Sequence, residues 1–158
     1  MGMATWIGRL AAGAAGGAAG TLAMDLVWYR RYRRGSGTQG FVDWETAAGT
    51  TSYEGAPAPA QVGRKLSTAV LGREPSPSSA RAMTNVVHWA TGMQWVMAYG
   101  LALPLVRRIG PLPGGVGLAA VAFSAAYVAL PLLQVYRPIW EYDGKVLLDD
   151  ATAHLVYG

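Results

Sequence analysis

The chain contains three long apolar stretches, separated by segments that are rich in charge, glycine and proline. They cover residues 5–29, 84–106 and 115–136, and none shows the alternation of apolar and polar residues that is typical of a half-buried strand. Each is close to the roughly 20 residues that a helix needs to cross the hydrocarbon layer of a membrane. The pattern predicts an all-α protein: a multi-pass transmembrane helical bundle with three full spans, in a single membrane domain over residues 1–158.

A fourth apolar segment, at residues 146–158, is shorter than the others. As a helix with a rise of about 1.5 Å per residue, it would extend only about 20 Å, less than the thickness of the hydrocarbon layer. We therefore expect an incomplete fourth helix, either the end of a truncated chain or a half-span that a partner completes. Pro131 is expected to kink the last turns of the third helix.

The connection between the first two stretches, residues 30–83, is polar and rich in Gly, Ser, Thr and Pro. Within it, Pro57 and Pro59 precede apolar residues at helical spacing. This predicts a short amphipathic helix at about residues 58–71, which would lie on the membrane surface, against the bundle or in solvent. The remainder of the connection is expected to be loop.

Basic residues determine the expected orientation. A cluster suited to contact with lipid headgroups directly follows the first stretch: Arg30, Arg31, Arg33 and Arg34. Such a cluster resists translocation, so we expect the polar connection in the cytoplasm and the N-terminus outside. A signal peptide has its positive charge before its apolar run, which indicates that this first span is uncleaved. Because Ala, Gly and Arg are abundant, we expect a bacterial plasma (inner) membrane.

Composition narrows the range of functions. The net charge of +4 is concentrated beside the apolar stretches and is accompanied by no base-reading motif, so no nucleic-acid partner is expected. The chain has no cysteine, which excludes disulfides, thiol catalysis and thiolate metal sites. No nucleophile elbow, phosphate-binding loop, dinucleotide fingerprint or zinc-protease motif occurs. The sequence therefore predicts no catalytic residues and no established cofactor.

Small residues recur every four positions and therefore lie along single faces of the predicted helices. In lipid, such a face allows the backbones of two helices to approach closely. In the first stretch, one row consists of Gly8, Ala12, Gly16 and Gly20, and its neighbour of Arg9, Gly13, Gly17, Thr21 and Asp25. In the second stretch, His88, Gly92 and Gly100 share a face. We expect close helix packing there, with another helix of this chain or with a second protomer.

Ionisable side chains lie at similar depths in three of the predicted helices. Asp25 is about one turn from the cytoplasmic end of the first span, and His88 and His154 are about one turn from the starts of the second and fourth. Asp150 shares a helix face with His154. Because such groups are costly in lipid and rarely face it, we expect Asp25, His88, His154 and Asp150 to form a shared polar cluster.

Several roles are compatible with that cluster. The first interpretation is structural, an Asp–His hydrogen-bonded network that fixes the register of the helices. A second is a metal site formed by His88, His154 and Asp25, because imidazole and carboxylate are ordinary ligands of Zn and Fe. A third is a proton or ion relay. Haem ligation by the two histidines is a further alternative.

Three segments carry a resemblance to a known group: Gly20-Thr-Leu-Ala-Met-Asp25, His88-Trp89…Gly92…Tyr99-Gly100, and Ala153-His-Leu-Val-Tyr-Gly158. In these segments the chain resembles YagU-type uncharacterised bacterial inner-membrane proteins. The resemblance covers the spans and not the polar connection. It implies a four-helix membrane bundle and no particular reaction. In such proteins the last segment continues as a complete helix, which favours the truncated-chain interpretation.

The sequence therefore favours a non-enzymatic accessory protein of the membrane. Its small-residue faces would pack against further copies of the chain or against a larger membrane complex, with the lipid bilayer as its other partner. The alternative is a small proton or ion conductor, or a metal-dependent membrane enzyme, centred on the Asp/His cluster.

Overall fold

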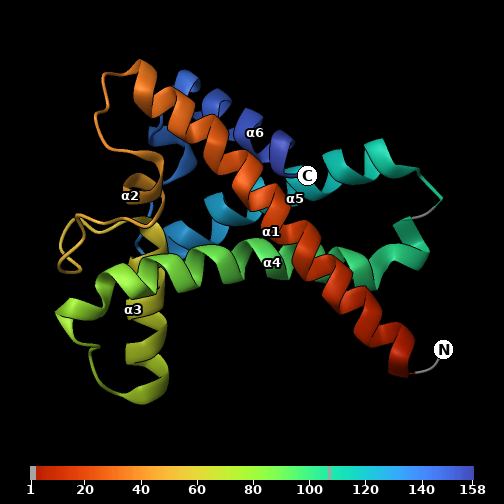
Figure 1. Ribbon diagram of the computed structural model, residues 1–158, viewed down its shortest axis with the longest axis horizontal. Helices are drawn as coiled ribbons and strands as arrows, with labels where there is room; N and C mark the ends of the chain where they lie inside the picture. Colours follow the sequence, from red (N-terminus) through yellow and green to blue (C-terminus); the bar gives the residue numbers. More distant parts are fainter. Residues whose placement is uncertain (1–2, 107) are drawn as a thin grey trace.

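The computed structural model describes residues 3–106 and 108–158, and within these ranges all regular secondary structure is helical. The bundle is formed by α1 (Met3–Arg34), α4 (Ala80–Val106), α5 (Pro111–Leu132) and α6 (Gly144–Tyr157) (Figure 1). The connections contain α2 (Phe41–Glu45), α3 (Ala58–Leu71) and two 3₁₀ turns, η1 (Pro77–Ser79) and η2 (Ile139–Glu141). The prediction of an all-α protein is confirmed.

Helix ends differ from the expected spans for local reasons. α1 continues through the arginine cluster to Arg34, because arginine and tyrosine are compatible with a helix, and it ends where Gly35, Ser36 and Gly37 follow in succession. α5 ends at Leu132, directly after Pro131, and the chain then turns through Gln134 at a φ of 53°. The expected kink is therefore a helix end, and residues 133–136 lie outside the helix. α3 occupies the range expected for the amphipathic helix.

The helices of the bundle pack as antiparallel neighbours in the order α4, α1, α6, α5. α1 crosses α4 obliquely, and its C-terminal half lies beside α6 (Figure 1). On the other side, α6 packs against α5, with its C-terminal Gly158 close to Gly115 and Ala119. This arrangement brings the end of α1, the start of α4 and the start of α6 to the same end of the bundle.

Glycines allow α1 to approach its neighbours closely. A Cβ atom on Gly17 would lie 2.6 Å from Met93 Cα, and one on Gly13 would lie 2.8 Å from Met97 Cα, both in the backbone of α4. A Cβ on Gly20 would meet the carbonyl oxygen of Tyr157 in α6 at 2.6 Å. At these three positions, the small-residue rows pack within the chain. Gly8 is different, because a Cβ there would have no neighbour within 4 Å.

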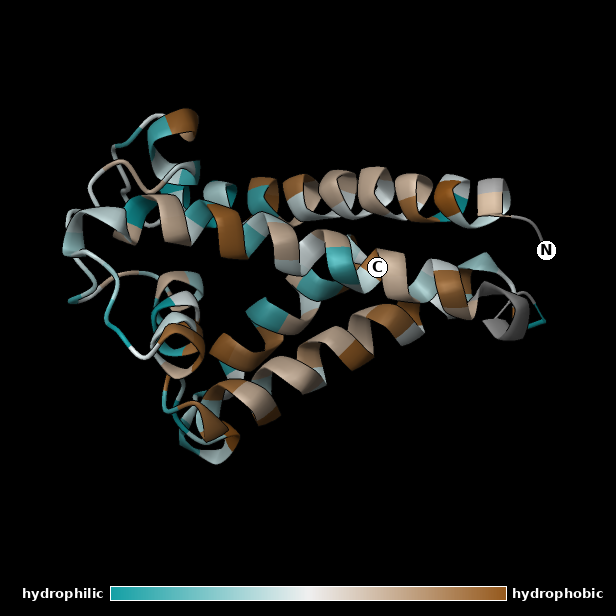
Figure 2. Ribbon diagram, turned by 90° about the horizontal axis from the view of Figure 1, so that it is seen from below, coloured by the Kyte–Doolittle hydropathy of each residue, from teal (hydrophilic) through white to brown (hydrophobic). Residues whose placement is uncertain are grey.

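The polar connection folds into a cap at the end of the bundle where α1 ends. Tyr53 is buried with Ala60 and Ala80 in a small apolar core, and its hydroxyl group is 2.9 Å from Ser79 Oγ. Figures 1 and 2 show α3 lying across the direction of α1 and α4, and Figure 2 shows hydrophilic residues gathered at this end. The connection therefore contains the expected helix α3, and the remainder, which was expected to be loop, also includes α2 and η1.

Two helices in the described ranges, Thr5–Arg34 and Pro111–Leu132, are long and apolar enough to cross a membrane. α4 does not join them, since polar residues such as Asn85, His88 and Gln94 interrupt its apolar run. Both candidate spans leave large apolar side chains exposed, including Leu26 of α1 and Val128 of α5. Two such helices suggest membrane association, and a bundle of three or more spans is not confirmed.

Candidate functional site

The α1–α4 contact places a buried carboxylate against a histidine. Because the two helices are antiparallel, Gly17 faces Met93, Thr21 faces Gly92, and Asp25 lies level with His88. His88 Nε2 and Asp25 Oδ2 are 2.9 Å apart, within hydrogen-bond distance. Asp25 is only 4% exposed, so its charge has little contact with solvent. The small residues of the same row allow the two helices to come close enough for this pair.

A third side chain reaches this pair from the cap. Glu45 is the last residue of α2, a short helix held against the end of α1 by contacts between the rings of Tyr29, Tyr32, Phe41 and Trp44. From the other side, Asn85 and Arg81 of α4 donate hydrogen bonds to the carbonyl oxygen of Thr46, each at 3.0 Å. The backbone next to Glu45 is thus fixed to both α1 and α4.

The side chain of Glu45 brings a second carboxylate next to Asp25. Its Oε1 atom is buried and has no hydrogen-bond partner in the described part of the chain. One ligand atom from each of Asp25, Glu45 and His88 lies within 4.8 Å of the other two. Burial, and next the negative charge of Asp25, raise the pKa of Glu45 above its ordinary value of 4.5. Two carboxylates at this separation favour a proton or a cation between them.

The raised pKa of Glu45 predicts how the stability of the metal-free protein depends on pH. The folded state binds this proton more tightly than the unfolded state does, so the stabilising contribution is complete below pH 4.5 and decreases as pH rises through the raised pKa. Thermal unfolding in a chelator, from pH 4.5 towards neutrality, should show this decrease in the unaltered protein. Glu45→Gln should show a shallower decrease, and equal slopes would contradict the assignment.

The four residues of the expected polar cluster form two separate pairs. His154 Nδ1 is 3.2 Å from Asp150 Oδ1 in α6, and the imidazole packs edge-on against Phe123 of α5. No hydrogen bond or ion pair between described residues joins this pair to Asp25 and His88. The physical reason is that His154 lies on the side of α6 that faces α5, whereas His88 approaches Asp25 from α4.

Sequence reasoning missed Glu45. It is separated from Asp25 by a polar connection, and no fixed spacing relates the two. The only local signal was the aromatic pair Phe41 and Trp44, an apolar turn within an otherwise polar segment. That signal could have predicted that the segment docks against the bundle, but not which residues it would meet.

The arginines expected at the lipid headgroups have different surroundings. Arg31 donates hydrogen bonds to the carbonyl oxygen of Asp149 and to Thr152 Oγ1 of α6, and its guanidinium group lies over the ring of Trp28. It therefore connects α1 to α6. The other members of the cluster, Arg30, Arg33 and Arg34, are exposed.

Gly100 lies near the carbonyl oxygen of Arg9, which extends the α1–α4 contact away from the site.

No known protein family, curated protein or solved structure matches this chain.

Proposed function

We propose that this chain is a small helical membrane protein that binds a divalent transition-metal ion between Asp25, Glu45 and His88. The observation that carries the proposal is the buried Oε1 atom of Glu45, which has no hydrogen-bond partner in the described residues and lies beside a second carboxylate and an imidazole. A bound cation would satisfy this atom and neutralise the two acidic groups together.

The chemistry of the three donors fits such an ion. One imidazole nitrogen and two carboxylate oxygens suit Zn²⁺, Mn²⁺ and Fe²⁺, and the lack of thiolates disfavours softer ions. Metal–ligand bonds of about 2.1 Å place the ligands of a tetrahedral ion about 3.4 Å apart. The 2.9 Å between His88 Nε2 and Asp25 Oδ2 is near this spacing, and the carboxylate of Glu45 can rotate to join them.

Metal binding would connect the cap to the bundle. Asp25 comes from α1, His88 from α4 and Glu45 from α2, so an ion held by all three would fasten the polar connection to two long helices. Metal sites that join separate elements contribute their binding free energy to folding. The proposed role is therefore a site whose occupancy controls how firmly the cap is docked.

The proposed setting is a bacterial inner membrane, with the cap in the cytoplasm and the N-terminus outside. Its support is the arginine-rich end of α1 and the outward face of α5, a shallow apolar surface of Ala120, Val121, Ser124, Ala125 and Val128. The resemblance of three segments to YagU-type proteins agrees with this setting.

Calorimetric titration of chelator-treated protein with Zn²⁺ and with Mn²⁺ tests the proposal. We expect saturation at a single ion per chain, and an affinity about 100-fold lower in Glu45→Gln. Glu54→Gln is the matched control, because Glu54 is an exposed acid in the same connection and its loss should leave the affinity unchanged. Failure of either ion to bind the unaltered protein would reject the proposal.

A second proposed function, a self-associating subunit of a membrane complex, is favoured by one observation. Gly8, Ala12 and Gly16 form an i, i+4 row that remains exposed on α1, while Gly13 and Gly17 are buried against α4. An open row of small residues in lipid is suited to a second helix.

Ala12→Leu is expected to weaken such self-association without unfolding the chain. The larger side chain would prevent close approach of a second helix, and Ala12 is exposed in the single chain. Cross-linking in vesicles should show fewer dimers for this variant than for Ala90→Leu, an exposed alanine of α4. Equal yields of cross-linked dimer from the two variants would show that the exposed row is not the contact between copies.

A further inference from the structure

α3 has two different exposed sides flanking the face that packs on α4. The packed face contains Ala60 and Gly63, and a Cβ on Gly63 would lie 2.9 Å from Val87 Cγ2. On one side of this face are large apolar side chains, with Leu66 51% exposed and Val70 79% exposed. A helix that leaves such residues uncovered while its opposite side is polar is typical of the membrane–water interface.

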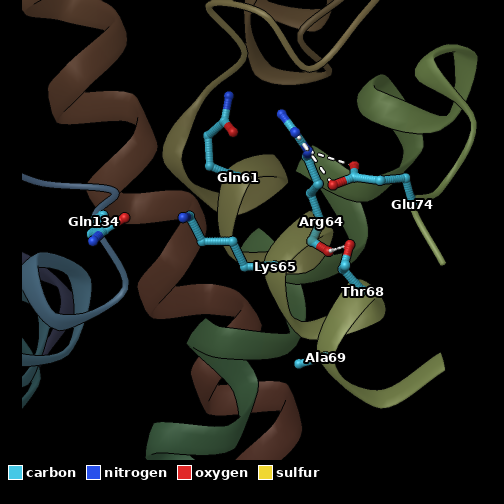
Figure 3. A pocket seen from close by; sticks show the side chains of 7 residues that line it. All are labelled: Gln61, Arg64, Lys65, Thr68, Ala69, Glu74 and Gln134. Atoms are coloured by element: carbon cyan, nitrogen blue, oxygen red, sulfur yellow. Dashed lines mark hydrogen bonds and ion pairs between the residues drawn. The ribbon is translucent and has the colours of Figure 1, made fainter. Parts of the chain in front are cut away.

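The polar side of α3 faces a groove. The groove has a volume of about 520 Å³, and its lining comes from α3, from Glu74 and from the turn after α5 at Gln134 (Figure 3). Arg64 forms an ion pair with Glu74, with 2.7 Å between Arg64 Nε and Glu74 Oε2. Lys65 has no hydrogen bond or ion pair within the described residues, and Figure 3 shows its side chain extending towards Gln134. The groove therefore carries a net charge of +1, with Lys65 beside the Arg64–Glu74 ion pair and the amide groups of Gln61 and Gln134.

The placement of α3 in the fold connects these two sides to a membrane. α3 lies across the direction of α1 and α4, at the end of the bundle that carries the arginine cluster (Figures 1 and 2). If the long helices cross a bilayer, a helix across them at this end lies along the surface of the bilayer. Arg30, Arg33 and Arg34 would then be at the same level as α3.

We infer that α3 is an in-plane anchor that inserts Leu66 and Val70 among acyl chains and binds the phosphate of anionic phospholipids through Lys65. The argument for this occupant is complementarity of charge and polarity: the basic groove on one side of α3 and the exposed apolar residues on the other match a layer of lipids with anionic headgroups and apolar tails. The inference rests on the proposed membrane insertion, and it is independent of the metal site.

Spin labels on the 158-residue chain, in vesicles of phosphatidylglycerol and phosphatidylcholine, test the anchor. Because the chain lacks cysteine, Val70→Cys, Val128→Cys and Ser78→Cys each give a single labelling site. We expect labels at positions 70 and 128 to collide with oxygen more than with a water-soluble nickel complex, and the label at position 78 to show the reverse. A water-exposed label at position 70 together with a lipid-exposed label at position 128 would overturn the anchor and leave insertion standing. Water exposure at both would overturn insertion.

Lipid retention tests the role of Lys65. Protein extracted from the same vesicles and analysed by native mass spectrometry should retain phosphatidylglycerol in preference to phosphatidylcholine. Lys65→Gln should lower the retained phosphatidylglycerol about fivefold. Arg73→Gln, which removes the same charge just outside the groove, should have no such effect. Equal losses in both variants, or equal retention of the two lipids, would contradict binding in the groove.

Discussion

Gly17→Ala is expected to destabilise the protein by about 3 kcal/mol, the upper range for inserting a methyl group into a packed contact. The added Cβ would lie 2.6 Å from Met93 Cα and 2.8 Å from the carbonyl oxygen of Gly92. Both are backbone atoms of α4, so a side-chain rotation cannot relieve the overlap and the two helices must separate. Thermal unfolding in detergent micelles, followed by circular dichroism, measures the effect.

Gly8→Ala is the matched control, with the same substitution in the same helix. A Cβ at position 8 would have no neighbour within 4 Å, so Gly8→Ala should not destabilise the protein, and the better helix propensity of alanine should raise the free energy of unfolding by up to about 1 kcal/mol. If the two variants unfolded at the same temperature, α1 and α4 would not be in close backbone contact at Gly17. That contact also places His88 beside Asp25, so Gly17→Ala should weaken metal binding as well.

His88→Gln is expected to lower the affinity for Zn²⁺ and Mn²⁺ by more than about 100-fold, because it removes the only nitrogen ligand of the proposed site. It should also destabilise the metal-free protein by about 1–2 kcal/mol, because the carboxylate of Asp25 is buried and loses its partner. The measurements are calorimetric titration and thermal unfolding in the presence of a chelator.

His154→Gln separates the proposed site from the second acid–histidine pair. His154 contacts Asp150 and Phe123 and has no hydrogen bond or ion pair to the proposed ligands in the described chain, so its substitution should leave the metal affinity unchanged. An equal loss of affinity in both variants would indicate one site that contains both histidines. That result would support the four-residue cluster expected from the sequence.

Local patterns predicted much of the helical structure. α3 follows its prolines and ends before Gly72, as Pro and Gly punctuation indicates, and the apolar runs correspond to α1, α4, α5 and α6. The period of four along α1 correctly placed Gly13, Gly17 and Asp25 on one packed face. These features depend on neighbours within a few residues, which a single sequence displays directly. Whether the helices cross a membrane stays a prediction.

The composition of the site depended on contacts between distant segments. The sequence indicated that Asp25 and His88 would avoid lipid, and the antiparallel register of α1 and α4 brings them together. It could not distinguish His88 from His154 as the partner of Asp25, since the choice depends on which side of α6 faces α5. Glu45 reaches the site only because aromatic residues dock α2 against α1.

The most direct test of the proposed site is X-ray absorption at the zinc edge on protein loaded with a single equivalent of Zn²⁺. The predicted spectrum contains scattering from one imidazole, with the remaining ligands oxygen. Two imidazoles would contradict the Asp25–Glu45–His88 site, because no second histidine lies among its ligand atoms in the described part of the chain. Scattering from oxygen alone would show that His88 does not bind the ion and that the proposed site is not a metal centre.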